Sequence, residues 1–243
     1  RAQTYERQLK MGIIPAGTKL TPRPAEIPAW DAQPANARRI YSRLMENYAG
    51  YLSFADHETG RLLAAIKELP DAANTMVIYI VGDNGASLEG TLTGSFNELT
   101  MQNGFALTAE QQLSLIEQYG GLDAWGTDAY APHYASAWAW AGNAPFQWGK
   151  QCASHLGGTR NGMVISWPER IKDAGGLRSQ FTHCIDVGPT ILEAAGIPEP
   201  EVVDGTSQKP MEGTSFLYTF EDGNAAERHT VQYFEIVGNR AIY

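Results

Sequence analysis

The stretch that most constrains this chain is MVIYIVGDNG, residues 76–85, where an uncharged apolar run meets an acid, an amide and a glycine. The run is short and rich in β-branched and aromatic residues, so we expect a buried strand of a parallel sheet. In open α/β sheets, ligands gather beyond the carboxyl ends of the strands. Asp83 and Asn84 would lie at such an end, where two oxygen donors suit calcium or magnesium better than zinc. A plain Asp-Asn-Gly turn is the alternative.

Composition excludes several classes of protein. The chain has 243 residues, of which 43% are hydrophobic and 19% charged, enough to bury a sizeable core. A formal net charge of −9 without a basic cluster argues against a nucleic-acid partner. No apolar run reaches the roughly 18 residues of a transmembrane helix. Cys152 and Cys184 lack the spacing of a disulfide framework or a metal site, so we expect buried thiols.

The order of patterns along the chain predicts an α/β fold with a mainly parallel sheet and flanking helices. Four regions follow one another: an irregular proline-rich segment at 1–35, a helix–strand–metal loop–helix region at 36–121, an aromatic insertion with a lysine loop at 122–160, and later strands with a helix at 161–243.

Several elements have sequence signals at their ends. Apolar residues recur at helical spacing from about Ala35, and this long helix should end before Pro70. Thr108 with Gln111 forms a capping box that begins another helix. A short helix should end at Ala195, with Gly196 as its cap. Strands are expected at 162–168 and 231–237.

The insertion at 122–149 is rich in aromatic rings and predicted to be irregular. Long loops in compact domains are often functional, and a wall of rings suits an apolar or aryl ligand. The alternative is that the rings pack the insertion onto the body of the protein, which we expect to explain at least half of them. The rings in question are Trp125, Tyr130, His133, Tyr134, Trp138, Trp140, Phe146 and Trp148.

A second polar segment, residues 146–160, places Lys150 and Arg160 on either side of a Gly157-Gly158 pair. Glycines allow close approach of the backbone to a ligand, and the two cations can bind an oxyanion. A solvated surface loop is the alternative.

Taken in order, five motifs resemble the C-terminal half of bacterial arylsulfatases. They are VGDNGAS at 81–87, Lys150 ahead of GGTR, ISWP at 165–168, DVGPTILEAAGIPEP at 186–200 and QYFEIVGNRAIY at 232–243. The resemblance covers almost the whole chain. It implies that residues 1–243 are the C-terminal portion of a single sulfatase catalytic domain whose N-terminal part is absent.

The resemblance implies an alkaline-phosphatase-like fold that hydrolyses small-molecule sulfate esters with one calcium ion and a formylglycine nucleophile. Asp83 and Asn84 would be two calcium ligands, and Lys150 would be the catalytic lysine that contacts the sulfate. His155 and Arg160 would surround that lysine as further substrate-binding residues. Because an amide oxygen favours calcium where imidazole favours zinc, Asn84 in place of histidine favours a sulfatase over the related phosphoesterases.

The chain departs from the family in one respect. Formylglycine is made from a Cys/Ser-x-Pro-x-Arg motif, and neither Cys152 nor Cys184 begins one. We therefore expect the nucleophile outside this chain, and expect the chain alone to be inactive. Two alternatives remain open: a phosphodiesterase or phosphonate hydrolase of the same superfamily, and a non-catalytic homologue that binds sulfated ligands. The sequence predicts no oligomeric state.

Overall fold

Helix α2, Ala35–Lys67, is the longest element of the computed structural model, which describes all residues from 1 to 243. The helix begins directly after Pro34 and ends before Pro70, which confirms the predicted boundaries. Proline is tolerated at a helix start but cannot continue a helix, because it lacks an N–H donor. Gly50 and Gly60 lie inside α2 without interrupting it.

The chain forms two compact units. The first comprises Arg1–Glu68, Asn84–Arg160 and Ile236–Asn239, and the second comprises Leu69–Asp83, Asn161–Glu235 and Arg240–Tyr243.

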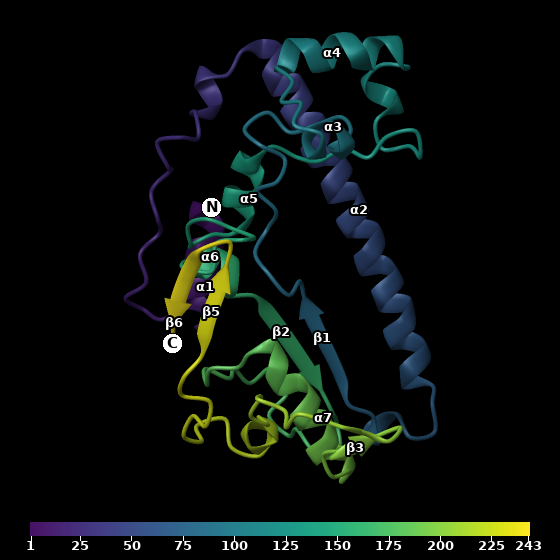
Figure 1. The fold of residues 1–243 in the computed structure, drawn as a ribbon, viewed down its shortest axis with the longest axis vertical. Helices are drawn as coiled ribbons and strands as arrows, with labels where there is room; N and C mark the ends of the chain where they lie inside the picture. Colours follow the sequence, from purple (N-terminus) through teal and green to yellow (C-terminus); the bar gives the residue numbers. More distant parts are fainter. The chain divides into compact units, whose positions relative to one another are not determined.

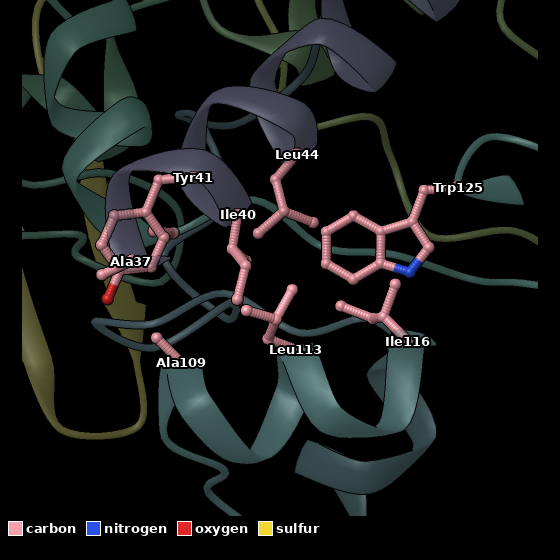
Figure 2. Close-up of a cluster of buried hydrophobic side chains, with 9 residues drawn as sticks. Ala37, Ile40, Tyr41, Leu44, Ala109, Leu113, Ile116 and Trp125 are labelled. Carbon is pink, nitrogen blue, oxygen red and sulfur yellow. The ribbon is translucent and has the colours of Figure 1, made fainter. Parts of the chain in front are cut away.

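The core of the first unit lies where the N-terminal half of α2 meets α4, Ala109–Gln118 (Figure 1). Leu44 of α2 points toward the indole of Trp125, which is 1% exposed, and Ile40 points toward Leu113 of α4 (Figure 2). The predicted capping box is confirmed at the start of α4. The Thr108 side chain accepts a hydrogen bond from the backbone N–H of Gln111, and the Gln111 side chain accepts one from the backbone N–H of Thr108.

The C-terminal half of α2 has a different environment. Its apolar residues recur at helical spacing, but Tyr51 is 71% exposed, Phe54 is 63% exposed, and Leu52 and Leu62 are also exposed. In a stable amphipathic helix the apolar stripe is normally buried against another element. This half of α2 therefore presents an uncovered apolar stripe.

In the second unit, β1 (Val77–Val81) pairs with β2 (Gly162–Ser166) in an antiparallel register that sets Val77 opposite Ser166. The predicted mainly parallel sheet is therefore wrong for this chain. Its sheets are three two-stranded pairs, with β3 (Val202–Val203) beside β4 (Thr206–Ser207) and β5 (Tyr233–Ile236) beside β6 (Asn239–Ile242). Hydrophobic runs reveal that strands exist but not their direction, which depends on pairing between distant segments.

The prediction that residues 76–82 form a buried strand is also wrong. The side chains of Tyr79, Ile80 and Val81 are exposed, and Val164 of β2 is 61% exposed. A strand with only one partner has an open edge, and no second layer covers these side chains.

The core of the second unit lies beside this strand pair. Trp167, Phe216 and Phe220 are buried together, and Val187 and Ala194 of α7 (Val187–Ala195) pack against them. Gly196 ends α7 with φ of 67°, the left-handed conformation that its predicted capping role requires.

Two further expectations need correction. The insertion predicted to be irregular contains a helix, α5 (Ser136–Gly142), whose buried residues are Ser136 and Ala139. Cys184 is exposed and Cys152 is half-buried, so neither is the buried thiol expected. The other α-helices are α1 (Ala2–Lys10), α3 (Glu98–Gln102) and α6 (Leu156–Thr159).

Candidate functional site

Glycine backbones hold the lysine loop against the segment that follows Asn84. The Gly85 N–H donates to the Gly158 carbonyl at 3.2 Å, and the Lys150 N–H donates to the Ala86 carbonyl at 3.0 Å. A Cβ on Gly85 would lie 1.7 Å from the carbonyl oxygen of Gly157. Side chains do not fit here, so these glycines are required by close backbone approach.

Lys150 forms an ion pair with Glu89 within this contact. Its Nζ lies 2.7 Å from Glu89 Oε2, and both side chains are partly exposed. Ser87 Oγ donates to the same carboxylate oxygen at 2.8 Å, and Gln151 Nε2 donates to the other at 2.9 Å. The hydrogen bond from Lys150 is the largest cause that lowers the pKa of Glu89, followed by the bond from Ser87. Glu89 is therefore a carboxylate that neutralises the lysine.

His133 extends this network from the insertion. Its Nδ1 lies 2.9 Å from the Tyr134 carbonyl oxygen, which can only accept, so Nδ1 carries a proton. Its Nε2 lies 2.9 Å from Ser87 Oγ. Through Ser87, His133 is thus connected to the Lys150–Glu89 pair.

His155 and Arg160 contact other groups. His155 Nδ1 lies 2.8 Å from Ser154 Oγ, and its ring lies 6.0 Å from that of Trp148. The Arg160 guanidinium lies over the Phe146 ring at 5.5 Å. Neither side chain takes part in the Lys150–Glu89 network, so their predicted contact with substrate stays a prediction.

Asp83 and Asn84 follow the end of β1 and are both exposed. Their carboxylate and amide oxygens are donors of the kind that calcium prefers. Two side chains fill only part of the six to eight oxygen positions typical of calcium, and the structure gathers no three His, Cys, Asp or Glu residues able to share a metal. The donor types fit calcium, but this chain supplies an incomplete set.

Four of the eight named rings of the insertion pack into the core of the first unit, in line with the expectation of at least half. Trp125 is in the core, and Tyr130, Tyr134 and Trp138 pack against it. Trp140 and Trp148 instead line a pocket of about 310 Å³. The pocket is otherwise lined by Pro24, Glu26, Ile27, Leu88, Thr91, Leu92 and Ser136.

The second unit holds a buried acid–histidine pair that the sequence did not reveal. Both carboxylate oxygens of the fully buried Asp186 lie within 2.9 Å of His229 Nδ1. The carboxylate also accepts from the backbone N–H groups of His183 and Thr214, each at 2.7 Å. These hydrogen bonds to one buried carboxyl group fix the three segments relative to one another. The pair is separated by 43 residues, so no local pattern predicts it.

Sequence reasoning found Lys150 but missed Glu89, Ser87 and His133. Ser87 is the last residue of the VGDNGAS motif, and Glu89 follows two residues later, so both lay beside a recognised signal. His133 was noted only as one ring among many. Its role depends on the fold, which brings it to Ser87 across 46 residues.

Comparison with known proteins matches residues 14–197 to the family model described as Sulfatase. The whole chain is 27% identical to an uncharacterized sulfatase of Schizosaccharomyces pombe and covers 42% of it. Over 88% of its length the chain is 26% identical to an arylsulfatase of Klebsiella aerogenes, again covering 42% of that protein. The chain thus spans less than half the length of these relatives.

None of the helices combines the length and apolar character needed to cross a membrane.

Sulfatases typically use calcium and a formylglycine nucleophile, and the family implies a sulfate ester substrate and an alkaline-phosphatase-like fold. The family match takes in most of the chain, including Asp83, Asn84 and Lys150. The chain therefore belongs to the sulfatase family.

Proposed function

We propose that this chain supplies part of the active site of an enzyme that hydrolyses sulfate esters of the arylsulfatase type. The observation that carries the proposal is the glycine-mediated contact that holds the Lys150 loop against the segment following Asn84. In a family whose substrate is an anionic ester, a lysine on a loop held against the segment that follows Asn84 would balance the charge of that ester.

Lys150 would contact the sulfuryl oxygens and balance the negative charge that develops on them in the transition state. Asp83 and Asn84 would hold one side of the calcium ion. When bound, calcium stabilises the charge of the sulfate, and the formylglycine supplies the nucleophile from sequence outside this chain. His155 and Arg160 would bind the substrate near Lys150.

Glu89 would act as a positioning residue for Lys150. Its carboxylate holds the ammonium group at 2.7 Å and restricts the long side chain. A bound sulfate would share the ammonium with Glu89.

The proposal assigns residues 1–243 to the C-terminal portion of one catalytic domain. Support comes from the 42% coverage of the relatives and from the exposed apolar stripe of α2. Isolated apolar patches of this kind mark surfaces that another polypeptide segment covers. The remainder of the domain would cover the stripe and supply the nucleophile.

The proposal is tested with a longer polypeptide that contains this chain and a Cys/Ser-x-Pro-x-Arg segment. We expect turnover of 4-nitrophenyl sulfate that exceeds turnover of bis(4-nitrophenyl) phosphate. Lys150→Ala should lower kcat/KM for the sulfate about 10²–10³-fold, the usual cost of removing one donor to a developing oxyanion.

Lys172→Ala is the matched control, because Lys172 bonds only the Pro168 carbonyl and should leave turnover unchanged. Preference for the phosphodiester would favour a phosphodiesterase or phosphonate hydrolase. Binding of sulfated ligands without turnover of either ester would favour a non-catalytic homologue.

A further inference from the structure

The imidazole of His133 has no role in the proposed function, yet the fold holds it in a fixed position. Its backbone is paired with that of the buried Ser95, since the N–H of each residue donates to the carbonyl of the other at 2.8 Å. Its ring is closely packed, because a Cβ on Gly90 would lie 2.5 Å from Nδ1 and 1.8 Å from the Tyr134 carbonyl oxygen. Only glycine leaves room there for the ring and the carbonyl.

The Nε2 atom of His133 is the ring nitrogen that can gain or lose a proton. Nδ1 donates to the Tyr134 carbonyl oxygen at 2.9 Å, so it keeps its proton in both charge states of the ring. Nε2 lies 2.9 Å from Ser87 Oγ, which in turn lies 2.8 Å from Glu89 Oε2. Ser87 has one hydroxyl proton and can donate it to only one of these two neighbours. The charge state of His133 therefore decides which neighbour receives it.

A neutral and a charged His133 leave Glu89 with different hydrogen-bond donors. In the neutral ring, the Nε2 lone pair competes with the Glu89 carboxylate for the Ser87 proton, so the carboxylate depends more on Lys150. In the imidazolium, Nε2 donates to Ser87 Oγ, and the serine proton is left to Glu89. Hydrogen bonds from Lys150 and Ser87 are the largest causes that lower the pKa of Glu89, and the positive charge of His133 acts in the same direction.

We propose that protonation of His133, transmitted by the Ser87 hydroxyl, loosens the ion pair of Lys150. This relay, from His133 through Ser87 to Glu89, makes His133 a positioning residue for the lysine. With the ring charged, Glu89 is stabilised by the Ser87 hydroxyl and by Gln151 Nε2, which donates to Oε1 at 2.9 Å. The carboxylate then depends less on the ammonium group, which is freer to bind an anion. The use of that lysine on a sulfate ester rests on the proposed function, whereas the relay itself does not.

Besides the Lys150–Glu89 pair, the titratable groups packed around His133 are phenols. The Tyr134 ring lies 5.0 Å from the imidazole, and Tyr48 of α2 packs edge-on against Tyr134 at 4.9 Å. Phenols ordinarily ionise near pH 10, and burial raises the pKa of Tyr134 further. Histidine ordinarily changes charge between pH 5 and 8. A change in the ion pair within this range therefore reports His133.

Carbon-13 NMR of the Glu89 carboxyl in the 243-residue chain tests the relay without any turnover. The resonance should show a second step between pH 5 and 8, beyond the titration of Glu89 itself at lower pH. His133→Gln should remove this step, because glutamine can still donate to the Tyr134 carbonyl but does not titrate. Ser87→Ala should remove it as well. His57→Gln, the same substitution at an exposed histidine of α2, should leave it unchanged.

Two results of this titration would overturn the proposal. The first is a parent chain without the second step, or a step that persists in His133→Gln. The second is a step that His133→Gln removes and Ser87→Ala keeps, because the charge of the ring would then act through space and not through the serine. The dispersion of the backbone amide resonances checks that each variant is folded.

Kinetics of the longer polypeptide separate the relay from the proposed function. A sulfate monoester keeps its single negative charge at pH 5.5 and pH 7.5. The ratio of KM at pH 7.5 to KM at pH 5.5 for 4-nitrophenyl sulfate should be about three- to fivefold larger in the parent than in His133→Gln, the scale of one partly exposed charge. Equal ratios in two active proteins would contradict the proposal. A His133-dependent NMR step without any turnover would instead leave the relay standing and contradict the proposed function.

Discussion

Glu89 sets the electrostatic environment of the lysine on which the proposed function depends. Its carboxylate accepts from Lys150 and Ser87, and both bonds favour the charged form over the protonated one. The pKa of Glu89 should therefore lie below its ordinary value of 4.5, and Lys150→Gln should raise it back toward that value. Carbon-13 NMR of the glutamate side-chain carboxyls as a function of pH measures this directly.

Lys172→Gln, which removes a lysine from the second unit, should leave the Glu89 titration unchanged. An unaltered Glu89 pKa in the Lys150→Gln protein would contradict the ion pair.

Because the folded-state pKa of Glu89 is lowered, the ion pair contributes stability above about pH 4.5, and this stability is lost as the pH falls through the folded-state pKa. Both groups are partly exposed, so this contribution is below about 1 kcal/mol.

Candidate site residues could be singled out from the sequence only where they belong to a local motif. Asp83, Asn84 and Lys150 lie within short runs of unusual composition and could be singled out in the sequence. His133 and the buried Asp186–His229 pair gain their roles from tertiary contacts across 46 and 43 residues. Sequence spacing carries no signal for such pairs.

Two leucines of helix α2 differ in burial, so their substitution compares packing at two places in one helix. Leu44 is 2% exposed in the core with α4, whereas Leu52 is 50% exposed eight residues later. Leu44→Ala should lower the free energy of unfolding by about 2–5 kcal/mol, through lost transfer energy and the cavity left behind. Leu52→Ala should change it by less than about 0.5 kcal/mol.

Urea denaturation followed by circular dichroism at 222 nm measures both variants against the parent chain. Leu52 is a matched control because residue type, substitution and helix are the same. Equal destabilisation by the two variants would mean that the C-terminal half of α2 is covered in the isolated chain.

At the scale of elements, helix boundaries were predicted better than strand partners. Helix ends depend on nearby residues, and the signals at Pro70, Thr108 and Gly196 are confirmed. Strand direction and burial depend on which other segments are present, so the parallel sheet and its buried strand were wrong here. Helix α5 was missed because aromatic rings and alanine gave no clear period.

At the scale of the molecule, the chain combines family membership with an incomplete site. It covers 42% of two sulfatase relatives, supplies two oxygen donors of the kind calcium prefers, and leaves one half of its longest helix uncovered. We therefore expect the 243-residue chain to show no turnover of 4-nitrophenyl sulfate, with or without added calcium. Steady turnover by purified chain would contradict it.

We propose that Asn84, after β1, and Lys150 act on one sulfate group. A double-mutant cycle in the longer polypeptide tests it most directly, with kcat/KM for 4-nitrophenyl sulfate measured for Asn84→Ala, Lys150→Gln and the double variant. Groups that act as a unit in catalysis are strongly non-additive. We predict that the double variant loses far less activity than the product of the two single losses. Independent losses that multiply would mean that Asn84 and Lys150 serve separate sites.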